Sequence, residues 1–408
     1  MDKPPSPLLK SRIPRKTIIV DPNLFAVIDD REFRIYNLHC PLRKGIIYYH
    51  RDGTIFEHNI HSPRKHEPRI IVPKHLSRCL VKISFIPIKG NQILLFATYY
   101  GNSGSYLHLS IHEICSETRV GPALWSFNGC VDGHFDIDDL ELIKSTENAL
   151  GITFGVRFIN HWKLFDISTT GTDASDNFPL IESGRIDVGL KLKKSWVGEN
   201  SLVILSPDRH ILLNADLKRG RHDETIDIHY FNSGGTNNMN FSFVTRMSIP
   251  IPWVEDLDIK IIDLWYPELA FSADGSKFAI VLNGNRVSVW DIRSKAPLKT
   301  FMEFPKPDYD DPPVRYLQFS SGNLGKEVLV FIERDDSSSL ETIHVINVTS
   351  FETEEILPLN LENPGIYGGV GALFFDPNGG TLYAELYGTI YEWDLQKNKH
   401  GPEWWIGE

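Results

Sequence analysis

Cysteine is scarce in this chain, and its spacing gives it no recognisable chemical role. The four cysteines, Cys40, Cys79, Cys115 and Cys130, lie far apart and form no C-x-x-C pair. Four cysteines are too few to staple a chain of 408 residues with disulfides, and without a C-x-x-C pair they predict neither a zinc site nor a thiol-exchange site. The hydrophobic content of 41% indicates a globular core instead.

Long apolar runs and helical periodicity are also missing. No run is long enough to cross a bilayer, and the N-terminus lacks the apolar region of a secretory signal. We therefore expect an intracellular protein, cytoplasmic, nuclear or both, that does not bind membranes. No long segment shows the 3.6-residue period of an amphipathic helix. The chain has 23 Phe, 14 Tyr and 9 Trp but only 4 Met, and aromatic rings pack well on pleated sheets.

Positive charge is in the minority. The chain contains 42 Lys and Arg against 53 Asp and Glu, so its formal net charge is −11. Proteins that bind nucleic acids generally neutralise phosphates with clustered Lys and Arg. The composition therefore argues against binding to RNA or DNA.

Two segments share a pattern of strand, turn and strand that ends in Trp-Asp. They run from Glu268 to Ser294 and from Ala372 to Leu395. The matching elements are the turns Phe271-Ser272-Ala273-Asp274-Gly275 and Phe375-Asp376-Pro377-Asn378-Gly379 and the endings Trp290-Asp291 and Trp393-Asp394. Self-similarity of this kind is typical of repeat architectures such as β-propellers.

These phrases resemble the WD40 repeat family. The resemblance, with the hydrophobic pattern elsewhere, predicts an all-β fold, a WD40-like β-propeller of seven blades, with six or eight as alternatives. The last blade shows only three strands, so we expect the N-terminal strand at residues 16–20 to complete it and close the ring. The predicted organisation is a flexible basic, Pro-rich tail at 1–15, one propeller at 16–395 and a C-terminal tail at 396–408.

The resemblance implies a non-enzymatic scaffold for protein–protein interactions, because members of that family mostly hold other proteins. Fold alone does not dictate function. The sequence shows no motif for a catalytic nucleophile, a nucleotide cradle or a metal site, so we expect no catalytic residues, cofactor or metal. An enzyme that gathers groups from several blades around the axis is an alternative.

One short motif suggests a specific partner. Trp290-Asp291-Ile292-Arg293 resembles the W-D-x-R motif of propellers that dock substrates onto cullin-RING ubiquitin ligases through an adaptor protein. Arg293 follows a strand end, where its guanidinium could form paired hydrogen bonds with a partner carboxylate. The alternative is structural, because Trp packs, Asp turns the chain and Arg is soluble.

Basic residues concentrate in two places. The first place surrounds a proline-directed kinase motif at Ser62 and predicts an exposed loop that docks an acidic peptide or phosphate. The alternative is a solvated loop with no specific role. Its candidate binding residues are His58, His61, Arg64, Lys65 and Arg69. The second place, Leu217-Lys218-Arg219-Gly220-Arg221, resembles the basic loop of phosphoinositide-binding propellers. A turn between blades is its alternative.

Overall fold

The structure is a computed structural model that describes residues 7–19, 36–51, 53–62, 68–74, 79–88, 91–101, 104–115, 119–130, 152–158, 161–167, 180–187, 201–208, 210–216, 223–232, 240–250, 268–282, 286–301, 314–323, 325–334, 340–360 and 370–397. These residues contain 27 strands and no helix. Accordingly, none of the described segments is a helix long and apolar enough to span a membrane.

Within the described residues, the strands form six four-stranded sheets and one three-stranded sheet, and every strand pair is antiparallel. The first four sheets along the chain, apart from β1, contain β2 (Tyr36–His39), β3 (Ile46–Arg51), β4 (Thr54–Asn59) and β5 (Arg69–Val72); β6 (Cys79–Ile88), β7 (Gln92–Gly101), β8 (Gly104–Ile114) and β9 (Val120–Cys130); β10 (Ile152–Phe158), β11 (His161–Ile167) and β12 (Leu180–Asp187); and β13 (Ser201–Leu205), β14 (Ile211–Asp216), β15 (Asp223–Asn232) and β16 (Asn240–Pro250). The remaining sheets contain β17 (Glu268–Phe271), β18 (Lys277–Leu282), β19 (Arg286–Asp291) and β20 (Lys299–Phe301); β21 (Val314–Phe319), β22 (Val328–Arg334), β23 (Leu340–Asn347) and β24 (Glu354–Asn360); and β25 (Ala372–Phe375), β26 (Thr381–Leu386) and β27 (Thr389–Asp394) with β1 (Arg15–Ile18).

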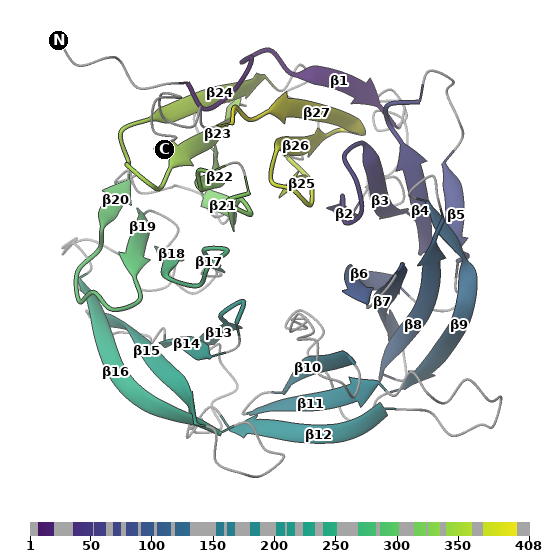
Figure 1. The fold of residues 1–408 in the computed structure, drawn as a ribbon, viewed down its shortest axis with the longest axis horizontal. Helices are drawn as coiled ribbons and strands as arrows, with labels where there is room; N and C mark the ends of the chain where they lie inside the picture. The colour runs from purple at the N-terminus through teal and green to yellow at the C-terminus, as the bar shows by residue number, and fades with distance from the viewer. Residues whose placement is uncertain are drawn as a thin grey trace, which may run out of the picture.

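The sheets stand around a common centre in Figure 1. β1 is set aside here, because it joins the last sheet from the N-terminus. In the other strands of each sheet, the first in sequence, such as β2 or β25, lies toward the centre. The last strand of a four-stranded sheet, such as β5 or β16, lies at the periphery. The predicted all-β, propeller-like architecture is confirmed at this level.

The two Trp-Asp segments have the same local structure. Each turn is closed by a backbone hydrogen bond, from Ser272 N–H to the carbonyl of Lys277 at 2.9 Å and from Asp376 N–H to the carbonyl of Thr381 at 3.0 Å. Inside each turn, Gly275 N–H donates back to the carbonyl of Ser272 and Gly379 N–H donates back to that of Asp376. Gly275 and Gly379 take positive φ angles of 70° and 65° at equivalent places, a conformation that favours glycine.

The hydrophobic core lies between neighbouring sheets. Trp290 is buried in a cluster with Leu213 and Ile228 of the preceding sheet. Trp393 is buried in a cluster with Val330 and Val345, again from the preceding sheet. The two indoles therefore occupy similar surroundings, and each joins two successive sheets.

The N-terminal segment runs along the last sheet. β1 pairs with β27, in a register that sets Arg15 opposite Glu392. Leu8 and Leu9, which lie within the predicted tail, are only 1% and 3% exposed and pack in the same cluster as Trp393. The chain therefore makes core contacts seven residues before β1 begins.

Candidate functional site

Arg293 is exposed, and its own motif holds it in place. Its Nε and Nη2 donate to Oδ1 and Oδ2 of Asp291 at 3.0 and 2.9 Å. These hydrogen bonds outweigh partial burial and lower the pKa of the Asp291 carboxyl. The Arg293 side chain is 79% exposed, and arginine has five N–H donors. A partner could therefore reach the donors that Asp291 does not use.

The second Trp-Asp pair is engaged differently. The Trp393 indole N–H donates to the carbonyl of Arg12 at 3.1 Å, whereas the Trp290 indole N–H donates to the Ser288 hydroxyl at 3.0 Å. Asp394 accepts from the Thr381 hydroxyl at 3.2 Å and from Arg15 Nη2 at 3.2 Å. Trp290, Trp393 and Asp394 thus have structural contacts, and Arg293 is the exposed group of the two motifs.

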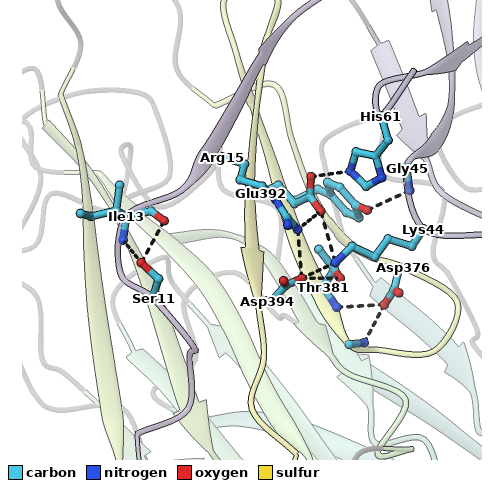
Figure 2. A network of polar contacts seen from close by, with 12 residues as sticks. Ser11, Ile13, Arg15, Lys44, Gly45, His61, Asp376, Thr381, Glu392 and Asp394 are labelled. Atoms are coloured by element: carbon cyan, nitrogen blue, oxygen red, sulfur yellow. Dashed lines mark hydrogen bonds and ion pairs between the residues drawn. The ribbon is translucent and has the colours of Figure 1, made fainter. Parts of the chain in front are cut away.

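A charged network surrounds Glu392 between the last sheet and the first (Figure 2). Arg15 Nη2 lies 2.5 Å from Glu392 Oε1, and His61 Nε2 lies 2.8 Å from Oε2. Lys44 Nζ lies 3.4 Å from Oε1 and also pairs with Asp394. Burial alone would raise the pKa of the Glu392 carboxyl, but His61 and Arg15 outweigh burial and lower it.

His61 can approach Glu392 because the neighbouring residue is a glycine. Gly45 has a φ of +81°, and a Cβ built there would lie 2.4 Å from His61 Nδ1. The Gly45 N–H also donates to the Tyr383 hydroxyl at 3.1 Å. This close contact fixes the β2–β5 sheet against the sheet that contains β27.

The candidate binding residues around Ser62 do not form one surface in the described part of the chain, because they contact different partners. His61 pairs with Glu392, whereas Arg69 pairs with Glu57 at 2.9 Å. His58 is half-buried, and burial lowers its pKa. Arg64 and Lys65 lie outside the described residues, as does the basic segment at 217–221.

The sequence does not predict the two basic side chains that share Glu392 with His61, which are Arg15 and Lys44. Arg15 lies within the predicted tail at 1–15, and its signal is the clustering of Lys10, Arg12 and Arg15 within six residues. Nothing local indicates that Arg15 and His61 would meet at the same carboxylate.

Exposed apolar side chains lie mainly on the outer strands of the sheets. The examples on outer strands are Ile18, Ile70, Leu124, Phe243, Val244 and Ile356. Phe243 and Val244 are consecutive and both 55% exposed. The ladder between β15 and β16 shifts register here and leaves Val244 without a partner, so two neighbouring side chains reach solvent.

Charged and aromatic groups flank this bulge. The Arg246 guanidinium lies 6.0 Å from the centre of the Phe243 ring and pairs with Asp227 at 2.6 Å. The His229 ring meets Phe243 edge-on at 5.7 Å. Aromatic and Arg side chains are enriched at the energetic centres of protein interfaces. We call Phe243, Val244 and Arg246 the β16 bulge surface.

No protein-family model matches this chain, and no curated protein has a matching sequence. Among the described residues, no three His, Cys, Asp or Glu side chains are grouped so that they could hold a metal ion. Function is therefore inferred from the fold and its surfaces.

Proposed function

We propose that this chain is a seven-bladed WD40-like β-propeller, closed by its N-terminal strand, that serves as a non-enzymatic scaffold for protein–protein interactions. The equivalent turns and buried indoles of the two Trp-Asp segments support the WD40-like assignment. The pairing of β1 with β27 supports closure of the ring.

The β16 bulge surface carries the proposal of a binding role. Single exposed apolar side chains are normal on soluble proteins. Phe243 and Val244 differ because they are adjacent, lie on an outer strand and have an Arg beside them. Burying both side chains against a partner would remove apolar surface from water, at roughly 25 cal/mol per Å².

Affinity capture with mass spectrometry from cells that express the chain tests this function. We expect the wild type to retain a reproducible set of proteins that a Phe243→Ser/Val244→Ser double variant loses. Leu124→Ser is the matched control, because Leu124 is also 55% exposed on an outer strand. A wild type that retains no partner at any salt concentration, or a double variant that retains the full set, would contradict the proposal.

A ubiquitin-ligase substrate receptor is the second candidate, and the exposure of Arg293 favours it. Purified adaptor protein should capture the wild type and lose Arg293→Ala. Arg293→Lys should also bind poorly, because an ammonium cannot form the planar paired hydrogen bonds of a guanidinium. Equal capture of wild type and Arg293→Ala, or of neither, removes this candidate.

Binding to phosphoinositides through residues 217–221 stays a prediction from the sequence. Flotation with phosphoinositide-containing liposomes should separate the wild type from a Lys218→Ala/Arg219→Ala variant. Equal flotation of the two would count against it.

A further inference from the structure

β1 is a basic outer strand on an acidic protein. Lys10, Arg12, Arg15 and Lys16 fall within seven residues, and Lys44 approaches from the β2–β5 sheet. Their carboxylate neighbours are Glu355, Glu392 and Asp394. Four of these five cations lie near the three carboxylates, and the fifth, Lys16, lies over the Tyr391 ring at 5.1 Å. The group therefore has two more positive than negative side chains, whereas the whole chain carries −11.

The outer edge of β1 presents backbone hydrogen-bonding groups. The sheet order ends at β1, so within the described part of the chain no strand pairs with this edge. The N–H of Ile19 donates to the carbonyl of Gly388 at 2.8 Å, continuing the ladder with β27. Alternate residues of an antiparallel strand face the partner. Thr17 therefore faces β27, and the N–H and C=O groups of Lys16 and Ile18 face outward.

Three of the other outer strands are less suited to pairing than β1. β9 and β24 contain Pro122 and Pro358, and proline interrupts the row of N–H donors. β16 is shifted by its bulge. β1 contains no proline and pairs with β27 without a register shift. Its positive charge opposes the approach of another basic strand and favours an acidic one.

We propose that the outer edge of β1 binds an extended acidic segment of a partner protein by strand addition. The partner backbone hydrogen-bonds to Lys16 and Ile18, and its Asp and Glu side chains pair with Lys16, Arg15 and Arg12. Ile18, which is exposed, adds apolar contact. This inference rests on the proposed scaffold function and assigns it a partner chemistry.

Fluorescence anisotropy with a labelled peptide of about ten residues, half Glu and half Thr, tests the proposal on the full chain. A peptide with Lys in place of Glu is the charge control and should not bind. Added salt should weaken binding of the Glu peptide, because exposed ion pairs are screened. Equal binding of the two peptides would overturn the proposal.

Three variants separate charge from backbone pairing. Lys16→Glu should weaken binding about tenfold, because it replaces an attraction by a repulsion. Ile18→Pro should weaken it about fivefold, because it removes an outward N–H and leaves the ladder with β27 intact. Ile18→Ala keeps that N–H and should stay within about threefold of wild type. The surface control is Lys299→Glu on β20, which should bind like wild type.

The outcomes distinguish this proposal from the scaffold function. If Lys16→Glu and Ile18→Pro bind the peptide like wild type, the edge proposal is wrong. It is also wrong if single-stranded RNA or anionic vesicles bind through Lys16 and the peptide does not. In either case, partner proteins still captured through the β16 bulge surface would leave the scaffold function standing. If the wild type captures no partner proteins and does not bind the peptide, the scaffold function and the edge proposal are both wrong.

Discussion

Glu355 accepts a hydrogen bond from the backbone N–H of Leu9 at 2.9 Å and so joins the N-terminal segment to β24. The neighbouring backbone is held as well, because Lys10 N–H donates to the carbonyl of Asp394 at 2.9 Å and Gln396 N–H donates to that of Leu8 at 2.8 Å. The segment is therefore part of the core between the last two sheets.

Replacing Leu9 by Ala should lower the free energy of unfolding by about 2–5 kcal/mol, because it leaves a cavity between two sheets. Urea unfolding followed by Trp fluorescence measures this change. Ile13→Ala is the control, since Ile13 is 82% exposed in the same segment. Equal stability of the two variants would mean that the leucine is not part of the folding core.

Buried or partly buried carboxylates link other successive sheets in the same way. Each accepts a backbone N–H from the sheet that follows it or, for Glu341, from the segment just before that sheet's first strand. The pairs are Glu57 with Val120 at 3.1 Å, Glu268 with Tyr316 at 2.9 Å, and Glu341 with Val370 at 2.5 Å. Glu268 also accepts the N–H of Leu317 at 2.5 Å. Tyr316 has a φ of 60°, so the carboxylate holds an unusual backbone conformation.

Replacing Glu268 by Ala should cost about 1.5–3 kcal/mol of stability, because two backbone donors lose a charged acceptor. Glu268→Gln keeps one acceptor oxygen, so its loss should be smaller. Thermal and urea unfolding of both variants provide the test. A stability equal to wild type in Glu268→Ala would exclude a stabilising role for this link.

Gly45 offers a test of the network around Glu392. Gly45→Ala should destabilise the fold more than Gly322→Ala does, because both have positive φ but only Gly45 would bring a Cβ against His61. We expect a difference of about 1–3 kcal/mol, the usual cost of overpacking. Similar losses in urea unfolding for the two variants would show that His61 moves aside freely.

Glu385 predicts a pH dependence. Burial raises its pKa to about 7 from an ordinary value of 4.5. Between these values the folded state keeps a proton that the unfolded state releases, so stability falls as pH rises. Glu385→Gln should remove this dependence, because its amide does not titrate. The unfolding free energy of the variant minus that of the wild type should therefore be larger at pH 8 than at pH 4.5, by up to about 3 kcal/mol. Unfolding free energies at both pH values would detect it, and a pH-independent difference would refute it.

His344 predicts a second pH effect. Its Nδ1 and Nε2 each lie 2.8 Å from a carboxylate oxygen, of Glu354 and Glu333 respectively. Burial lowers its pKa, but these two carboxylates outweigh burial and raise it. The contribution to stability is therefore complete below pH 6.5 and is lost as pH rises through the folded pKa. His344→Gln should lower the free energy of unfolding by about 1 kcal/mol more at pH 6 than at pH 9. Urea unfolding at the two pH values measures this difference, and equal losses would contradict a charged His344 between the two carboxylates.

Local features were readable from the sequence. The Asp-Gly and Asn-Gly turns, the alternating apolar residues and the Trp-Asp endings predicted hairpins that the structure contains, as in β17–β19 and β25–β27. The N-terminal strand expected at 16–20 is present as Arg15–Ile18. Each of these depends on neighbours along the chain, where turn chemistry and side-chain period act directly.

Contacts between distant segments depended on the folded chain. His61 meets Glu392 across 331 positions, and Glu355 meets Leu9 across 346. Composition predicts a tail at residues 1–15 and groups His61 with Arg69, whereas in the folded chain Leu8 and Leu9 are buried and His61 and Arg69 pair with different carboxylates. Which carboxylate meets which cation follows from strand register and sheet packing, because the partners lie on different sheets and are close only where those sheets pack together.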